Sequence, residues 1–544
     1  MKFEDKLKTL GKKEVFDEYC SFIDLSIDEY MQIQNSLLKE QIELWQESKL
    51  AKAIIKDHKV NSLKDFKKVI PLTDYNDYAD VLLRRDDSYL PSDASLWIET
   101  TWEGGTRPVK VAPYTRSMIE TTFTNMCACM LIATGKKRYD FDVKKTYHML
   151  YGLAPLPYAT GLIPLGLDDQ IGVKLLPDVE TATKLSFSER NKLGFKQGII
   201  TGIDYFFGLG SVTYYISKSI GNLSSGSSSG SSSISYSKLL KHPMRLKHLI
   251  SGLMKAKSEH RQLLPKDLFD LKGFIVAGTD NDLYKDDLEK MWGTRPFEIF
   301  AGTEPTLIGT ELYSRDGVIF FPDACYYEFI AEEDLKKQEL DPSYELPTYT
   351  MDEVVENTNY EIVLSVFKGG AFMRYRVGDM YRCVSTKNSA DNVKLPLFKF
   401  IDRVKDVIDI AGFTRITKNS IDEVIKLSKL DIAKYIATKE VDENNRPYLH
   451  MYVEMKTNSY CSDAITSHVL KDHLTAYFKY FDSDYADLKK ILGIDPLKVT
   501  ILRMNTLTKY PHPIRTINPS IHDVQSFLKF ADEAERPTGG SLDV

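Results

Sequence analysis

The sequence predicts an α/β protein with a largely parallel sheet, followed by a smaller C-terminal α+β domain. Segments 273–278 and 296–300 are short and apolar, as buried strands are, and segment 283–292 between them has helical character. Strands that alternate with helices are typical of a parallel sheet. Near the C-terminus, segment 448–455 alternates like a half-exposed strand and segment 464–478 has a helical pattern. This change of pattern predicts a second domain of different architecture.

The length and charge of the chain limit the classes of protein. Its 544 residues suffice for roughly two to four domains, and 43% hydrophobic residues allow a large buried core. We predict an N-terminal domain over residues 1–402 and a C-terminal domain over residues 403–544. The formal net charge of -6, from 71 basic and 77 acidic residues, argues against a general nucleic-acid binder. Local basic surface could still hold a nucleotide.

No segment of the sequence is typical of membrane insertion or of a disulfide framework. The N-terminal residues carry acids and lack an apolar core, and no stretch of about 18 apolar residues follows. We therefore expect a cytoplasmic protein without a transmembrane segment. The six cysteines form no CxxC pair, so we expect reduced and mostly buried thiols rather than a zinc site.

The N-terminal region places a glycine-containing loop between a strand and a helix. Residues 15–58 have helical periodicity, the strand is expected at 95–100, and helical periodicity resumes at 115–134. A strand, a glycine loop and a helix in this order form an anion-binding arrangement. The loop residues that suit a phosphate are Thr101, Gly104, Gly105, Thr106, Arg107 and Lys110. The two glycines allow close approach of backbone amides, and the two cations add charge. An ordinary surface turn is the alternative.

Two further segments carry groups that suit a nucleotide. After the strand at 296–300, Phe300 could pack on adenine, Thr303 could bond a phosphate, and Glu304 could hold Mg²⁺. The run Ala371–Asp379 resembles a strand that stops in a Gly-Asp turn, and Asp379 could accept hydrogen bonds from two ribose hydroxyls. Together with Ile401–Asp406, these segments have the order and spacing of the nucleotide site of adenylate-forming enzymes.

Two features of the middle and C-terminal regions are less specific. A Gly/Ser-rich insertion at about 221–237 precedes a basic helix at 238–261, which could contact a membrane surface or an acidic partner, or could be an ordinary solvated helix. Residues 396–416 are expected to form two strands. Ser420–Glu423 has the spacing of a capping box, so we expect a helix to begin there.

Other enzyme classes lack their motifs in this sequence. The ten histidines form no metal-ligand spacing, and no Gly-Lys-Ser/Thr phosphate loop occurs. The one GxSxG match, Gly226–Gly230, has no strand before it, as a nucleophile elbow requires. These observations argue against hydrolases of that type and against P-loop enzymes.

The chain resembles the Gretchen Hagen family of acyl-acid amido synthetases, a branch of the adenylate-forming superfamily. The segments that carry the resemblance are Phe66–Tyr78, Thr101–Thr115, Phe300–Glu304, Phe321–Phe329, Arg374–Asp379 and Leu397–Gly412. The resemblance implies an adenylate-forming (acyl-CoA synthetase-like) fold, with a large N-terminal α/β domain and a small, mobile C-terminal α+β domain.

The resemblance also implies an activity and roles for residues. ATP and Mg²⁺ would be bound, a carboxylic acid would be adenylated, and an amine, often that of an amino acid, would attack the acyl-adenylate. Arg403 would be the hinge residue, Tyr327 would line the nucleotide pocket, and Arg376 would belong to the motif that ends at Asp379. Lys509 is the candidate for the catalytic lysine of the C-terminal domain.

Departures from the family pattern leave other functions open. The phosphate loop has Trp102 and Glu103 where the family usually has Ser and Gly. An acid beside a triphosphate is unfavourable unless it points away or binds metal. A ligase that uses a thiol such as coenzyme A, or a weakened relative that serves as a sensor or scaffold, are the alternatives to an amide-forming enzyme.

Overall fold

The protein folds into two compact units, and each is described by itself. The computed structural model describes residues 3–100, 109–222, 242–278, 281–403, 407–411, 414–456, 463–481, 485–519 and 521–535. Unit 1 comprises Met1–Thr100 and Lys110–Asp402, and the chain from Arg403 onward belongs to unit 2. The predicted phosphate loop between Thr100 and Val109 lies outside the described residues, apart from its ends.

Unit 1 is built on an eleven-stranded sheet, within the residues described, in the order β10-β11-β12-β13-β9-β8-β7-β6-β5-β3-β4. One half is parallel, since β3 pairs with β4 and β5, β5 with β6, and β6 with β7 in the same direction. These strands are β3 (His148–Gly152), β4 (Lys174–Leu176), β5 (Tyr205–Leu209), β6 (Gly273–Ala277) and β7 (Phe297–Gly302). The α/β fold class predicted from apolar strands separated by helices is therefore confirmed.

The other half of the sheet is largely antiparallel. It contains β8 (Thr306–Glu311), β9 (Val318–Phe320), β10 (Cys325–Ala331), β11 (Thr358–Val366), β12 (Tyr375–Ser385) and β13 (Leu397–Arg403). Antiparallel hairpins join β7 to β8 and β8 to β9. A separate hairpin pairs β1 (Leu96–Glu99) with β2 (Val111–Tyr114), whose strands flank the predicted phosphate loop.

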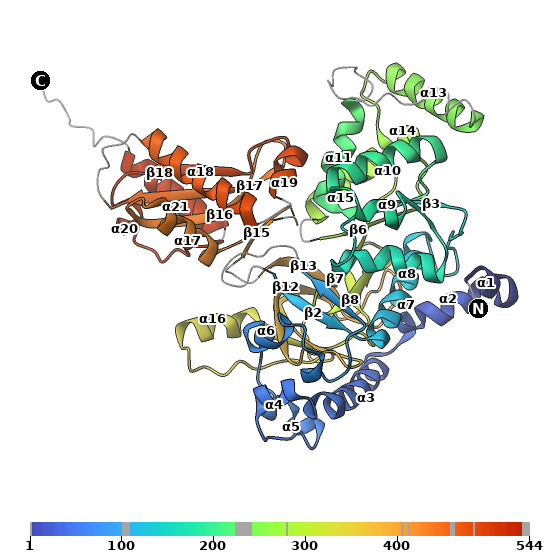
Figure 1. Cartoon of the computed structure of the whole chain (residues 1–544), viewed down its shortest axis with the longest axis horizontal. Coiled ribbons are helices and arrows are strands. Elements are labelled where there is room, and N and C mark those ends of the chain that lie inside the picture. The colour runs from blue at the N-terminus through green and yellow to red at the C-terminus, as the bar shows by residue number, and fades with distance from the viewer. Residues whose placement is uncertain are drawn as a thin grey trace, which may run out of the picture. The chain divides into compact units, whose positions relative to one another are not determined.

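Helices cover the sheet of unit 1 (Figure 1). The N-terminal ones are α1 (Phe3–Leu10), α2 (Lys12–Cys20), α3 (Ile27–Gln46), α4 (Lys49–Ile55), α5 (Leu63–Val69) and α6 (Asn76–Leu82). Those of the middle are α7 (Arg116–Ala133), α8 (Leu162–Gln170), α9 (Val179–Thr183), α10 (Phe187–Thr201), α11 (Gly210–Asn222), α13 (Pro243–Ser258), α14 (Pro265–Leu268), α15 (Asn281–Trp292) and α16 (Glu332–Leu340). Short 3-10 turns are η1 (Ser21–Asp24), η2 (Asp87–Tyr89) and η3 (Ala159–Gly161). No helix within these described stretches is long and apolar enough to cross a membrane.

Local signals explain where the helices of unit 1 begin. The Ser26 hydroxyl and the Glu29 carboxylate form a reciprocal capping box at the start of α3, and the Thr115 hydroxyl accepts from the Met118 amide at the start of α7. Helix α7 is buried along most of its length, and its buried residues include Cys127 and Cys129. Burial raises the pKa of both thiols above the ordinary value, so these cysteines are packed and unreactive side chains.

Unit 2 is a small α+β unit. Its three-stranded sheet contains β16 (Ile432–Val441), β17 (Pro447–Met455) and β18 (Leu497–Leu502), and a separate hairpin pairs β14 (Val407–Ile410) with β15 (Thr414–Thr417). Its helices are α17 (Lys418–Ser428), α18 (Asp463–Phe481), α19 (Tyr485–Leu492), α20 (Thr506–Lys509) and α21 (Ile521–Glu535). Ile436, Tyr452 and Phe527 are among the residues of its core.

Two expectations for this region were wrong in detail. Residues 396–416 contain strands β13, β14 and β15 rather than two strands. The helix cap is Thr417 rather than Ser420, because the Thr417 hydroxyl accepts from the Ser420 amide and the Ser420 hydroxyl closes the box from the third helical position. Both residues are good caps, so spacing alone could not decide between them.

Candidate active site

The turn between β7 and β8 carries a buried carboxylate at the end of the parallel half of the sheet. Ligands of open α/β sheets bind beyond the carboxyl ends of parallel strands, which is where this turn lies. Glu304 stands in the turn and is only 6% exposed. The Tyr114 hydroxyl donates to the carbonyl oxygen of Thr303 at 2.8 Å, which holds the turn against β2. Thr303 and Glu304 thus directly follow the end of β7, which pairs with β6 as a parallel strand.

Three segments that are distant in sequence meet at Glu304. The Tyr375 hydroxyl donates to Glu304 Oε1 at 2.7 Å. Lys110 Nζ lies 3.3 Å from the same oxygen and 3.4 Å from the Tyr375 hydroxyl. Lys110 Nζ also lies 5.7 Å from the centre of the Tyr75 ring. A lysine, a carboxylate and a tyrosine therefore form one cluster, which joins three of the segments that the sequence singled out.

The ends of the predicted phosphate loop are closed at this cluster. The Thr100 amide donates to the Lys110 carbonyl, and the Lys110 amide donates to the Thr100 hydroxyl, each at 2.9 Å. The loop therefore begins and ends beside Glu304. Its predicted residues Thr101, Gly104, Gly105, Thr106 and Arg107 lie outside the described residues, and of the predicted set the structure describes Lys110.

The Gly-Asp motif lies within a strand and not at the end of one. β12 continues from Tyr375 to Ser385, and its pairing with β11 shifts between Arg376 and Met380. Gly378 has φ +83° at this bulge, a conformation that favours glycine. The expected strand end was wrong because a glycine of positive φ suits a turn and a bulge equally well. Asp379 follows the bulge and is 2% exposed.

The first segment of the family resemblance lies directly beside this motif. Thr73 forms a parallel bridge with Tyr375, and the Thr73 amide donates to the Arg374 carbonyl at 2.9 Å. The hydroxyls of Thr73 and Tyr78 both donate to the Met373 carbonyl, at 2.8 and 3.0 Å. These bonds fix the backbone that leads into Tyr375 and so help to place its hydroxyl on Glu304.

The two arginines of the motif are held by carboxylates of β10 and β11. Arg374 makes a two-pronged contact with Glu328, at 3.0 and 3.1 Å, and both side chains are buried. Arg376 makes a similar contact with Glu361, at 2.9 and 2.6 Å. Arg376 was predicted to bind the nucleotide, and in this structure its guanidinium faces Glu361.

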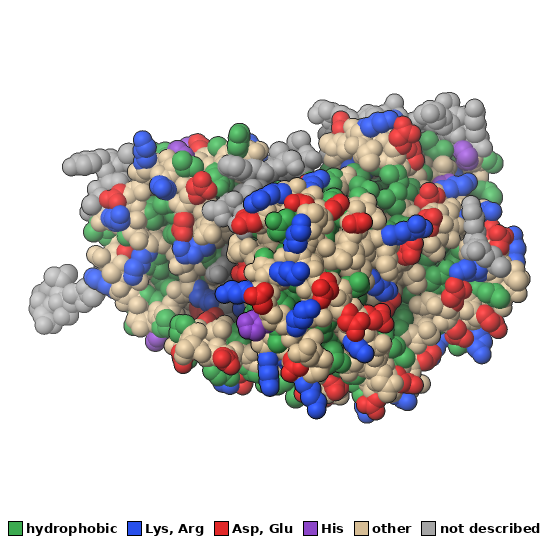
Figure 2. All heavy atoms as spheres, turned by 60° about the horizontal axis from the view of Figure 1, so that its bottom comes forward, with side chains coloured by type: hydrophobic (Ala, Val, Ile, Leu, Met, Phe, Trp, Pro, Cys, Tyr) green, Lys and Arg blue, Asp and Glu red, His purple; other side chains and the backbone are tan. Residues whose placement is uncertain are grey.

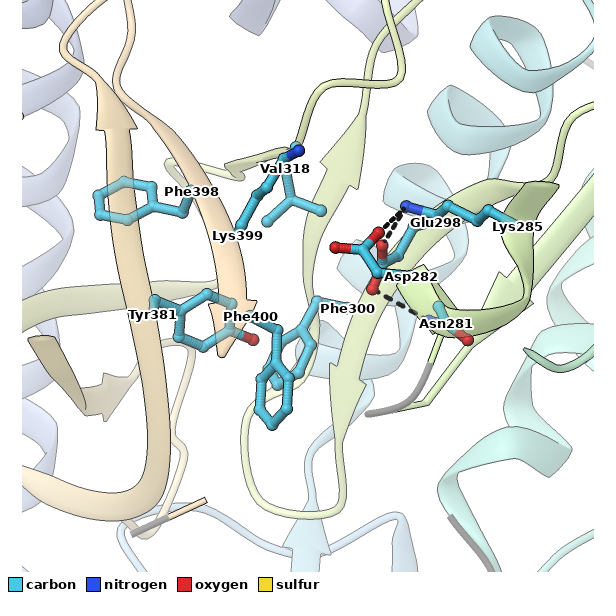
Figure 3. Close-up of a pocket in the computed structure, with 11 residues that line it drawn as sticks. Asn281, Asp282, Lys285, Glu298, Phe300, Val318, Tyr381, Phe398, Lys399 and Phe400 are labelled. Carbon is cyan, nitrogen blue, oxygen red and sulfur yellow. Dashed lines mark hydrogen bonds and ion pairs between the residues drawn. The ribbon is translucent and has the colours of Figure 1, made fainter. Parts of the chain in front are cut away.

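Phe300 also lines a pocket that contains several aromatic side chains (Figure 3). The Phe300 ring meets Tyr381 edge-on, with ring centres 5.1 Å apart, and lies nearly parallel to Phe400 at 6.3 Å. Lys285 contacts Glu298 at 2.6 Å and Glu311 at 2.8 Å on the opposite wall. Burial disfavours the charge of Lys285, but the two carboxylates outweigh it and raise the pKa of the ammonium. The pocket thus combines aromatic rings with a hydrogen-bonding wall.

Tyr327 lies in the core of unit 1. Its side chain is fully buried, and its hydroxyl donates to the Phe321 carbonyl at 2.8 Å. Its ring stacks on Phe320 with ring centres 5.0 Å apart. Strand β10 is buried along its length, so Tyr327 faces the core in this structure, and its expected contact with the nucleotide stays a prediction.

The residues expected to act from the C-terminal unit lie on well-defined elements. Arg403 is the last residue of β13. Lys509 is exposed at the end of α20. The buried Glu454 carboxylate accepts from the Leu507 amide at 2.7 Å and from the Thr508 hydroxyl at 2.7 Å, and so attaches α20 to the sheet of unit 2. Sequence reasoning missed Glu454, since nothing local marks it.

The donor atoms around Glu304 fit a magnesium ion that is shared with a phosphate. Within the described residues, no group of three His, Cys, Asp or Glu side chains could hold a metal by itself. Mg²⁺ is commonly held by one or two carboxylates together with substrate phosphates and water. Tyr375 and Lys110 both contact Oε1 of Glu304, so the carboxylate is held in place beside a cationic side chain.

Comparison with solved structures defines the class of fold. AtGH3.15 acyl acid amido synthetase in complex with 2,4-DB matches over 95% of this chain and 96% of its own, with a TM-score of 0.53 and 15% identity. 2-Hydroxyisobutyryl-CoA ligase in complex with 2-HIB-AMP and CoA matches over 92% of this chain and 91% of its own, with a TM-score of 0.56 and 15% identity. The fold is therefore that of the adenylate-forming enzymes.

The sequence comparison is more specific over one segment. Residues 318–403 match the GH3 family central domain, which confirms the expected resemblance to the Gretchen Hagen family there. This segment contains β9 to β13, with the Gly-Asp motif. A curated relative, the Pre-mRNA-splicing factor ISY1 homolog of Dictyostelium discoideum, is 36% identical over 98 residues. That match spans 18% of this chain and 31% of the relative, which is too little to show a family.

Proposed function

We propose that this protein is an ATP-dependent ligase that adenylates a carboxylic acid and transfers the acyl group to an amine, with an amino acid as the expected acceptor. The observation that carries the proposal is the cluster of Lys110, Glu304 and Tyr375 at the end of β7. It lies in a fold of the adenylate-forming class and beside a match to the GH3 central domain. The loop between Thr100 and Lys110 supplies further phosphate-binding groups in this proposal.

The nucleotide would be held by groups of unit 1. Asp379 would accept hydrogen bonds from the ribose hydroxyls, and Phe300 would pack on adenine. Lys110 would exchange its contact with Glu304 for the α-phosphate. Glu304 would then hold Mg²⁺, with the Tyr375 hydroxyl keeping the carboxylate in place. Bound Mg²⁺ supplies positive charge that offsets the charge of the phosphates.

The chemistry then needs little covalent help from the protein. The carboxylate oxygen attacks the α-phosphorus, a new C–O–P link forms, and pyrophosphate leaves. In the second step the amine nitrogen attacks the acyl carbon, the C–N bond forms, AMP leaves with its oxygen, and a proton passes to solvent. Lys110 stabilises charge that develops at the phosphate, and Lys509 is proposed to act from unit 2 in the first step.

A thiol acceptor is the second candidate function. The match to a CoA ligase over more than nine-tenths of both chains supports it at the level of the fold. The GH3 central-domain match favours the amine, since the GH3 protein that this chain resembles in structure is named an acyl acid amido synthetase. The two functions share the first half-reaction and differ only in the second.

The first half-reaction is tested by exchange of labelled pyrophosphate into ATP. The full chain is assayed with Mg²⁺ and a panel of aryl, indole and fatty acids, and exchange that depends on the acid is expected for at least one class. Asp379→Ala should weaken ATP binding in a direct titration by about 1.5–3 kcal/mol, as loss of a charged acceptor does. Absence of exchange with every acid, while ATP still binds, would instead favour the sensor or scaffold.

The acceptor is identified separately with the acid that supports exchange. Amino acids and coenzyme A are offered in parallel, and the products are weighed by mass spectrometry. An amide product supports the proposed function, and a thioester product assigns the CoA ligase instead.

A further inference from the structure

Helix α13 is attached to unit 1 by a narrow strip of small residues. Gly252 and Ala256 are its buried positions. A Cβ atom at position 252 would lie 2.2 Å from the Asp267 carbonyl oxygen, so the helix approaches α14 closely there. Arg245 also faces α14, because its guanidinium donates to the Leu268 carbonyl at 2.8 Å. The inward face of α13 is therefore defined, and Figure 1 shows the helix at the outer end of unit 1.

The opposite face of α13 presents apolar side chains to water. Ile250 is 47% exposed, Leu253 is 42% exposed and Met254 is 68% exposed. The spacing of these three residues places them on one stripe of the helix. Met244, near the start of the helix, is 84% exposed. A helix that packs through Gly252 and Ala256 while its larger apolar residues face outward has a second apolar surface, which the described residues of unit 1 leave exposed.

Lysines border this outward stripe. Lys247 lies one turn before Ile250, and Lys257 lies one turn after Leu253. Both are exposed, as is Lys255. None of the three forms an ion pair with the described residues, and residues 242–258 contain no Asp or Glu. On the face that Figure 2 shows, by contrast, acidic and basic side chains are intermixed. α13 is thus a basic segment on a chain whose formal net charge is -6.

We propose that α13 is an interfacial helix that attaches unit 1 to an anionic lipid surface. An apolar stripe with flanking lysines is the pattern of helices that lie in the plane of a membrane interface. The stripe enters the boundary between headgroups and acyl chains, and Lys247, Lys255 and Lys257 contact acidic headgroups. The stripe of a single helix suits a deformable lipid surface, whereas a specific protein interface needs a larger complementary area. This inference does not depend on the proposed ligase activity.

The test is co-sedimentation of the full chain with lipid vesicles. The wild-type protein should sediment with vesicles that contain phosphatidylserine, and much less with pure phosphatidylcholine vesicles. Added salt should weaken the binding, because the headgroup attraction is screened. Lys247→Glu with Lys255→Glu and Lys257→Glu should lower the partition coefficient on the order of 100-fold, about fivefold for each lysine.

A second variant tests the apolar stripe, and a matched control tests specificity. Ile250→Ser with Met254→Ser should reduce binding to phosphatidylserine vesicles by at least as much as the charge change. Leu340→Ser removes an apolar side chain of α16 that is 88% exposed, and it should leave binding unchanged. All substituted positions are exposed, so thermal unfolding of the variants should match that of the wild type.

Two results would overturn the proposal. Equal sedimentation of the wild type and both α13 variants would move any lipid contact elsewhere. No sedimentation of the wild type with phosphatidylserine vesicles, together with binding of α13 to polyglutamate, would assign an acidic protein partner in place of lipid.

Discussion

The Tyr375 hydroxyl donates a 2.7 Å hydrogen bond to Glu304 across 71 residues of sequence. This bond joins the strand of the Gly-Asp motif to the turn that ends the parallel half of the sheet. Tyr375 is 1% exposed, and its ring packs at 4.8 Å from Phe372, so its hydroxyl has little freedom to point elsewhere. The bond therefore orients the carboxylate that we propose as the magnesium ligand.

Tyr375→Phe removes this hydroxyl and keeps the ring. We expect pyrophosphate exchange to fall about tenfold or more, because a hydrogen bond to a charged group contributes about 1.5–3 kcal/mol. The apparent affinity for Mg²⁺ should fall while ATP affinity changes little. Tyr313→Phe is the control, since the Tyr313 hydroxyl is buried and makes no hydrogen bond within the described residues. An unchanged Mg²⁺ dependence in Tyr375→Phe would mean that the bond is only structural.

Glu304→Gln keeps the shape of the side chain and removes its charge. We expect exchange to fall on the order of 100-fold or more, because a metal that neutralises phosphate charge contributes several kcal/mol. Part of the lost rate should return at high Mg²⁺ concentration. Glu333→Gln, at an exposed position of α16, should behave as the wild type. A wild-type rate in Glu304→Gln would remove this residue from the site.

Arg374→Met breaks the buried contact with Glu328. The remaining carboxylate is 1% exposed and would keep only the Thr348 hydroxyl at 2.6 Å and the more distant Lys67 ammonium at 3.9 Å, so most of the compensation for its buried charge would be lost. We expect the free energy of unfolding of unit 1 to fall by about 3–5 kcal/mol. Urea unfolding measures this change. The double variant with Glu328→Gln removes both charges and should be clearly more stable than Arg374→Met alone; equal stability of the two would contradict the explanation.

The sequence predicted the strands, the helices and the segments that carry the candidate site, but it did not predict which side chains of those segments touch. The strands at β6 and β7, the helix α15 between them and the segments of Lys110, Glu304 and Tyr375 were all found from residue patterns. The bond between Tyr375 and Glu304 was not, because no local signal specifies a contact across such a separation. The burial of Tyr327 was not predicted, because β10 is buried along its length and such a strand shows no alternation that separates core positions from exposed ones.

Glu454→Gln tests whether the attachment of α20 matters for the proposed lysine. The change should weaken the bonds to the Leu507 amide and the Thr508 hydroxyl, and so loosen the helix that ends at Lys509. We expect pyrophosphate exchange to fall about fivefold with ATP affinity unchanged, as for loss of roughly 1 kcal/mol of positioning energy. Glu443→Gln, at an exposed position between β16 and β17, is the control.

A double variant separates positioning from general damage to unit 2. If Glu454 acts through Lys509, Glu454→Gln should slow exchange little further once Lys509→Ala is present. Fully additive losses would show that Glu454 supports the unit by another route. An unaffected rate in Lys509→Ala would move the catalytic lysine elsewhere in unit 2.

A carboxylate on the sheet of unit 2 should make that unit sensitive to acid. Glu440 accepts hydrogen bonds from His450 at 2.8 Å, from Tyr452 at 2.6 Å and from Tyr448 at 2.9 Å. Burial opposes its charge, but the bonds from His450 and Tyr452 outweigh burial and lower the pKa of Glu440 from 4.5 to about 2. The folded state therefore binds this proton less readily than the unfolded state does.

The sign of the pH dependence follows from this lowered pKa. The stabilisation is fully present above pH 4.5 and is lost as the pH falls from there through about 2. We expect Glu440 to account for about 1–2 kcal/mol of this loss, less than the full shift implies, because water reaches part of the side chain. Urea unfolding of wild type and Glu440→Gln, followed by a probe in unit 2, measures it. The variant should lose less stability over this range, and parallel curves would mean that other carboxylates cause the acid sensitivity.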